Sequence, residues 1–203
     1  MSTQRSVAKS AGVIGSLTGV SRLLGFVRDL VIASAFGTTV AAEAFVVSFK
    51  LPNLLRDLAG EGAANAAFVP VLTECREKKP EDFWGLVSTL FLIMAAVLAL
   101  LSIAGILFAP LVIRLVAPGF VAAADADKFP LTVQLTRAIF PYIFLIGLSA
   151  LAMGVLNTLK EFTTSALGPI LLNISMIVWG IFFERFYGPM ALVLGVLCGG
   201  VLQ

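Results

Sequence analysis

The chain has 203 residues, of which 59% are hydrophobic and 13% charged, and its formal net charge is +2. Soluble domains carry roughly a quarter charged residues, so this composition excludes an ordinary soluble protein and indicates a polytopic membrane protein. The chain has no histidine, which excludes histidine-based metal sites, catalytic triads and proton relays within it. Its two cysteines, Cys75 and Cys198, lie in a charged loop and an apolar run, so neither a disulfide between them nor a metal site is expected.

Six apolar segments are candidate membrane helices, for which a bilayer core requires about 20 residues. The expected spans are residues 6–36, 41–58, 83–117, 130–156, 165–183 and 189–203. The first span begins with Arg5 and Lys9, as a signal peptide does, but it is too long and too charged to be one. The sixth is short for a crossing and still apolar at Gln203, so residues 1–203 are expected to form the N-terminal transmembrane lobe of a longer protein, with the C-terminal lobe absent.

The orientation of the chain is predicted from the positive-inside rule. The loop Glu74–Asp82 carries Arg76, Lys78 and Lys79, and placing it in the cytoplasm also places the N-terminus there. Before this loop, residues 63–72 form either a short helix at the membrane interface or a simple continuation of the second span. The chain is therefore expected to be a multi-pass membrane protein with a cytoplasmic N-terminus.

Four cationic side chains lie inside the first two spans: Arg22, Arg28, Lys50 and Arg56. A charge at the middle of a bilayer costs between about 2.5 and 17 kcal/mol, so a protein keeps several of them only where they face a wet cavity. Because the connection Gly37–Thr39 is very short, the two spans are expected to be antiparallel neighbours. The six-residue offset between the arginines of the first span recurs between the cations of the second, so the two pairs can stand opposite each other across a shared cleft.

The centre of this cleft is expected to be net positive and to bind an anion. Four carboxylates lie near the cations, three of them close to span ends: Asp29, Glu43, Asp57 and Glu61. Arginine suits phosphate because its planar guanidinium can bond two oxygens at once. Two alternatives stay open: the cations snorkel to headgroups or form internal ion pairs, and Asp29 and Glu43 either neutralise arginines or couple transport to protons or sodium. Asn157 and Asn173 are expected to form hydrogen bonds at helix ends or between helices.

Several stretches of the chain resemble the MurJ (MviN) family of lipid II flippases. Residues 21–29, which read SRLLGFVRD, are similar to the first helix of the family, and residues 45–56, which read FVVSFKLPNLLR, are similar to its second-helix signature. Shorter matches follow in the same order and spacing at residues 61–63, 67–70, 117–120, 140–143 and 171–175. The resemblance covers essentially the whole chain, and the two arginine-bearing motifs are long and specific.

The resemblance implies an all-α fold of fourteen membrane helices, arranged as two pseudo-symmetric six-helix lobes plus two extra helices. This chain is expected to be the N-terminal lobe. The resemblance also implies that the protein moves lipid II, the undecaprenyl-pyrophosphate-linked disaccharide-peptide precursor of peptidoglycan, across the bacterial cytoplasmic (inner) membrane. Transfer is expected to run from the cytoplasmic to the outer leaflet, with alternating access as the hypothesis for its mechanism, and the implied protein is a transporter rather than an enzyme.

Four residues are expected to bind the pyrophosphate and sugar headgroup: Arg22, Arg28, Lys50 and Arg56. The three arginines match arginines of the family's cavity, whereas the lysine is included from the charge pattern alone. Asp29 and Glu43 are the expected charge-balancing or coupling residues, and Glu43 departs from the family, which commonly has aspartate there. The arginine of the C-terminal lobe that completes the family's site lies outside this chain.

Other function classes stay open at this point. The nearest is a related exporter of another polyprenyl-linked oligosaccharide or of an amphipathic drug, although a drug exporter is expected to favour acidic cavity residues because its substrates are usually cations. An anion channel is a second class. A membrane enzyme of lipid-phosphate metabolism is a third, against which the absence of histidine and of a paired acidic motif argues. The expected partners are lipid II, membrane lipids and the cell-wall synthesis machinery, with no nucleic acid, metal or cofactor.

Overall fold

The computed structural model describes residues 2–60, 63–121 and 127–203, and these residues form helices and no β-strand. The expected all-α fold is therefore confirmed for the described part of the chain. The α-helices are α1 (Ser2–Phe36), α2 (Val40–Gly60), α3 (Ala63–Lys78), α4 (Phe83–Leu107), α5 (Ala109–Val116), α6 (Lys128–Ile139), α7 (Pro141–Thr158), α8 (Phe162–Phe182), α9 (Glu184–Tyr187) and α10 (Met190–Leu202). Two short 3-10 helices, η1 (Pro80–Asp82) and η2 (Pro118–Phe120), precede α4 and follow α5.

Proline interrupts the third and fourth expected spans. α4 ends before Phe108, and Pro110 lies in the first turn of α5. Pro141 begins α7 directly after Phe140, so α6 and α7 together form a helical stretch of 31 residues with a proline at its junction. Proline lacks a backbone N–H and its ring crowds the preceding turn, so it is tolerated in the first turn of a helix and disturbs the helix before it.

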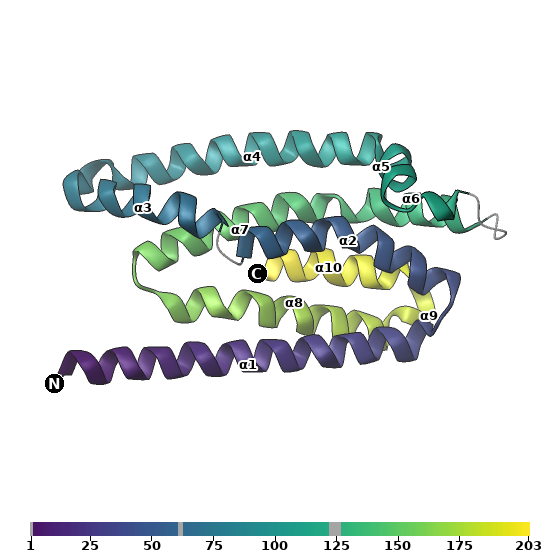
Figure 1. Cartoon of the computed structure of the whole chain (residues 1–203), viewed down its shortest axis with the longest axis horizontal. Coiled ribbons are helices and arrows are strands. Elements are labelled where there is room, and N and C mark those ends of the chain that lie inside the picture. Colours follow the sequence, from purple (N-terminus) through teal and green to yellow (C-terminus); the bar gives the residue numbers. More distant parts are fainter. Residues whose placement is uncertain (1, 61–62, 122–126) are drawn as a thin grey trace.

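The helices lie side by side in a bundle, with α4 along one edge and α1 along the other (Figure 1). α1 packs mainly against α8, and α8 packs mainly against α1 and α10. α2 instead packs against α6 and α7, and α4 lies along α7. Gly37, which ends α1 with a φ of 55°, allows the sharp turn into α2 without the strain that a side chain would introduce. The two helices are thus antiparallel and joined by a tight turn, yet each has its own packing partners.

The main core lies where α2, α6, α7, α8 and α10 meet, and Phe45, Tyr142 and Leu192 are fully buried there. Glycines of α10 allow the backbones to approach closely. A Cβ atom at Gly199 would lie 2.9 Å from Cα of Leu172 on α8, a separation that real side chains do not tolerate. α8 is therefore held tightly between α10 and α1, which places one face of α8 against the arginine-bearing half of α1.

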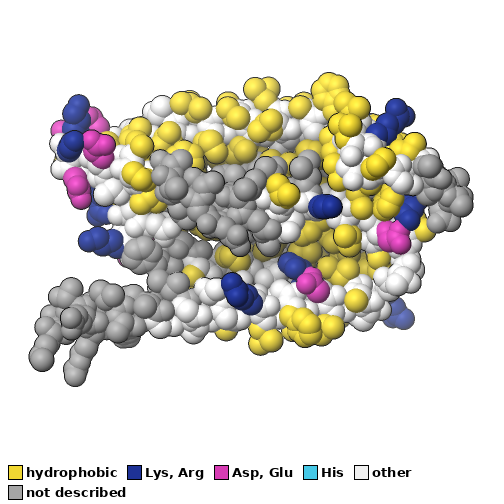
Figure 2. All heavy atoms as spheres, viewed as in Figure 1, with side chains coloured by type: hydrophobic (Ala, Val, Ile, Leu, Met, Phe, Trp, Pro, Cys, Tyr) yellow, Lys and Arg dark blue, Asp and Glu magenta, His cyan; other side chains and the backbone are white. Residues whose placement is uncertain are grey.

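Among the residues that the structure describes, two helical stretches are long and apolar enough to cross a membrane, Pro80–Leu107 and Lys128–Thr158. The first stretch leaves much of its apolar surface uncovered: Leu92 is 74% and Leu100 is 68% exposed. Figure 2 shows hydrophobic side chains spread along the α4 edge, whereas charged side chains gather toward the ends of the bundle and in the middle of this face. An apolar surface of this extent needs an apolar surrounding.

Candidate functional site

The guanidinium of Arg28, in the second half of α1, is held by two partners, and the whole side chain is only 16% exposed. Nε and Nη2 donate to Oδ1 of Asp29 at 3.0 and 2.9 Å. Nη1 donates to Oδ1 of Asn173 on α8 at 2.9 Å. These bonds use three of the five N–H groups that a guanidinium carries. Within the described part of the chain, the other two have no protein acceptor.

Asn173 joins α8 to α1 through both ends of its amide. Its side chain is 4% exposed, and Nδ2 donates to the backbone oxygen of Ser21 at 3.1 Å. The prediction that Asn173 forms an interhelical hydrogen bond is confirmed. Sequence reasoning missed that its partner is Arg28, because no local pattern shows which face of α8 meets α1.

Arg22 on α1 and Lys50 on α2 are exposed, and neither forms an ion pair with a residue of the described ranges. Figure 2 shows lysine or arginine side chains over α1 and over α2 in the middle of the face, on either side of a hollow. Asp29 offsets the charge of Arg28, whereas the charges of Arg22 and Lys50 are not offset by an ion pair within the described ranges. An anion entering from this side meets two open cations and a third whose orientation is constrained.

Three further predicted residues lie at or just beyond the end of α2. The side chains of Arg56 and Asp57, and the whole of Glu61, lie outside the described part of the chain. The role of Arg56 as a ligand for the headgroup therefore stays a prediction.

Glu43 lies in the first turn of α2, near the tight turn from α1. Its carboxylate, 49% exposed, forms an ion pair with Nζ of Lys128 at the start of α6. The ammonium of Lys128 also lies 4.4 Å from the centroid of the Phe120 ring. Sequence reasoning considered Glu43 only as a partner of nearby arginines or as a coupling residue. The structure instead gives Glu43 a lysine partner from another helix.

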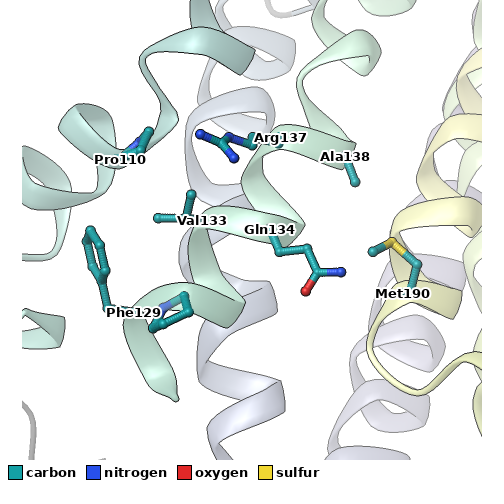
Figure 3. A pocket seen from close by; sticks show the side chains of 8 residues that line it. Pro110, Phe129, Val133, Gln134, Arg137, Ala138 and Met190 are labelled. Carbon is teal, nitrogen blue, oxygen red and sulfur yellow. The ribbon is translucent and has the colours of Figure 1, made fainter. Parts of the chain in front are cut away.

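A separate pocket of about 560 Å³ lies between α5, α6 and α10, and it is lined by Pro110, Phe129, Pro130, Val133, Gln134, Arg137, Ala138 and Met190. Figure 3 shows Gln134 extending toward Met190 and Arg137 extending toward Pro110. None of the predicted site residues lines this pocket, and Arg137 is the only cation among its lining residues. Its walls are otherwise mainly apolar, so it lacks the converging cations that the predicted anion site requires. Elsewhere, no group of three or more histidine, cysteine or carboxylate side chains is placed to hold a metal in the described ranges.

Comparison with known proteins identifies the family. The model of the family "Lipid II flippase MurJ" matches residues 32–203. The chain is 42% identical over 193 residues to the lipid II flippase MurJ of Burkholderia cenocepacia, covering 94% of this chain and 37% of that protein. It is 37% identical over 216 residues to the probable lipid II flippase MurJ of Treponema pallidum, covering 100% of this chain and 39% of that protein. The chain thus spans less than two fifths of the length of these curated relatives.

A solved structure is also similar, that of the lipid II flippase MurJ in an inward closed conformation. It superposes with a TM-score of 0.79 at 31% identity and covers 93% of this chain and 39% of that one. The likeness extends over the arrangement of helices described above, since nearly all of the chain takes part in it. The curated relatives also bear the names of transporters, not of enzymes. Sequence, family model and fold agree: the chain is an integral membrane protein that belongs to the lipid II flippase MurJ family.

Proposed function

We propose that the chain is the N-terminal lobe of a flippase that moves lipid II from the cytoplasmic to the outer leaflet of the bacterial inner membrane by alternating access. Membership of the MurJ family supports this substrate, because the matching relatives and the similar structure are named for it. The complete protein then supplies a second lobe, and the face of α1 and α2 that carries the exposed cations borders the path of the headgroup.

The observation that carries the proposal is the constrained guanidinium of Arg28. Two of its N–H groups lack a protein acceptor in the described chain, while the other three are bonded to Asp29 and Asn173. A pyrophosphate offers several charged oxygens, and bonds between a guanidinium and a phosphate are about twice as strong as neutral ones. Holding the guanidinium in advance reduces the entropy that binding must remove.

The exposed cations have a different part in the proposal. Arg22 and Lys50 are free to move with the headgroup as the two lobes change orientation, because no ion pair within the described ranges restrains them. Their charged groups take over part of the solvation that water gives the pyrophosphate outside the membrane. The lipid tail stays in the bilayer, so the protein has to shield only the polar headgroup.

Rescue of a bacterium depleted of its own flippase tests the proposal. The complete protein is expected to restore growth. Each of three variants, Arg22→Ala, Arg28→Ala and Arg56→Ala, is expected to lower the amount of lipid II that reaches the outer leaflet by about tenfold or more, because each loses a charge-assisted contact. Arg185→Ala is the matched control, because it removes an exposed cation from α9. It is expected to behave as wild type.

Three results would contradict the proposal. Normal rescue by all three arginine variants, at wild-type amounts of protein in the membrane, would remove the role of the cations. A purified protein that translocates another polyprenyl-linked oligosaccharide or an amphipathic drug but not lipid II would replace the substrate. A sustained single-channel current would indicate an anion channel instead.

A further inference from the structure

We infer that Asn173 is a positioning residue for headgroup binding: it holds the Arg28 guanidinium so that its two remaining N–H groups face the ligand. The inference rests on the proposed function and deepens it. Asn173 lies on α8, outside the two helices that carry the predicted binding residues, and its contact with Arg28 spans 145 positions of the sequence.

The chemistry of the contact determines how the amide is oriented. Nδ2 donates to the backbone oxygen of Ser21, and Oδ1 accepts from Nη1 of Arg28. Turning the amide over would set an NH₂ group against the guanidinium and an oxygen against a carbonyl, which loses both bonds. Because the side chain is 4% exposed, water cannot easily replace them. Asn173 therefore presents a fixed acceptor to one side of the guanidinium.

The neutrality of Asn173 matters as much as its geometry. Arg28 already has one carboxylate partner, Asp29, whose side chain is 64% exposed. A second carboxylate at position 173 would leave the three groups with a net negative charge, and an anionic headgroup would be repelled. An amide supplies the same acceptor geometry and leaves the local charge unchanged. Asn173 thus orients the guanidinium of Arg28, whereas the positive charge that attracts the headgroup comes from the cations.

Ser175 provides a matched control on the same helix. It is also buried, and its hydroxyl donates to the backbone oxygen of Gly195 on α10 at 2.8 Å. It therefore forms a buried interhelical hydrogen bond of the same kind as Asn173, but toward α10 and away from Arg28. A purely structural role for Asn173 predicts that Ser175→Ala and Asn173→Ala have similar effects.

A double-mutant cycle tests the inference. It compares the binding of purified lipid II to variants of the complete protein, measured by native mass spectrometry or fluorescence titration. We expect Asn173→Ala to weaken binding by about tenfold, as loss of one bond to a charged group predicts. Arg28→Ala is expected to weaken it at least as much, and the double variant no further than Arg28→Ala alone, because Asn173 acts through Arg28. Asn173→Asp is expected to bind less well than Asn173→Ala, and Ser175→Ala to stay within about twofold of wild type.

The outcomes separate this inference from the proposed function. If wild-type protein fails to bind lipid II, both fall. If wild type binds and Asn173→Ala binds equally well, the positioning role alone is overturned. The same follows if the loss of affinity in the double variant equals the sum of the losses in Asn173→Ala and Arg28→Ala. The same holds if Asn173→Asp binds better than Asn173→Ala, since added negative charge then helps. Thermal unfolding of every variant in detergent identifies any loss of binding that follows from loss of the fold.

Discussion

The carboxylate of Glu43 at the start of α2 pairs with the ammonium of Lys128 at the start of α6, and the ring of Phe120 lies against the same ammonium. This contact joins two helices and η2 at the end of the bundle where α1 turns into α2 (Figure 1). The Lys128 side chain is only 15% exposed, so removing its carboxylate partner would leave a largely buried ammonium without an ion pair. The pair fixes α2 at the end opposite the charged α3–α4 connection.

Charge reversal at this pair is the first prediction. Glu43→Lys sets two ammonium groups together, and we expect it to lower the unfolding temperature and to impair rescue of a flippase-depleted cell. The exchange of both charges, Glu43→Lys with Lys128→Glu, is expected to recover most of the loss, about 1 kcal/mol for a partly exposed pair. Thermal unfolding in detergent and growth measure the two effects. A double variant as impaired as the single one would show that the pair has no such role.

A second prediction concerns the close approach of α10 and α8. Gly199→Ala places a Cβ atom 2.9 Å from Cα of Leu172, so we expect the helices to move apart and the protein to lose about 2 kcal/mol or more, as overpacking of a core does. Gly85→Ala is the control, because a Cβ atom there has open space in α4. It is expected to stabilise the protein slightly, since alanine favours a helix by up to about 1 kcal/mol relative to glycine. Equal unfolding temperatures for the two variants would contradict the packing described.

Lys160 offers a stabilising substitution. It connects α7 to α8 with a φ of 67°, a left-handed conformation that costs a residue with a side chain about 1 kcal/mol or more. Lys160→Gly removes that cost, and the resulting gain is partly offset by the greater freedom of glycine in the unfolded chain. We therefore expect a small rise in the unfolding temperature, whereas Lys160→Val is expected to lower it. A fall with glycine would indicate that the lysine side chain makes a contact worth more than the strain.

The proposed orientation of the chain is testable with a native cysteine. Cys75 is partly exposed in α3, close to the charged connection that the positive-inside rule predicts to be cytoplasmic. In a variant whose other cysteines are replaced, a membrane-impermeant maleimide added to spheroplasts is expected to label Cys75 only after permeabilisation. Thr38→Cys, in the exposed turn between α1 and α2, is the control and should react in intact spheroplasts. The reverse labelling pattern would mean that the N-terminus lies outside.

Much of the fold follows from local features of the chain. Apolar runs and proline positions indicate helices, and Pro110 and Pro141 lie where helices are interrupted. The interruption after Leu107 was not predicted, because the same proline is compatible with a kink inside one continuous helix. The sequence is also compatible with two arrangements of residues 63–72, an interfacial helix or a continuation of the second span. The structure places these residues in α3, where Leu72 is buried beside Phe83 and Val87.

The candidate site also has features that the sequence predicts and features that it does not. The unusual cost of charge within an apolar segment was enough to single out Arg22, Arg28 and Lys50. It could not show that Arg28 is constrained while the other two are exposed, because exposure depends on neighbouring helices. Nor could it find Lys128 as the partner of Glu43, since the two belong to different helices and no motif connects them.

The sequence by itself determined that this protein is helical and belongs in a membrane, and it singled out the cations inside apolar segments, because hydrophobicity, helix period and the cost of desolvating a charge are properties of short segments. Only the tertiary structure decided which helices meet: it brought Asn173 to Arg28 and Lys128 to Glu43. The physical reason is that a helix sets the direction of its own side chains, whereas the identity of its neighbour follows from how all the helices pack together.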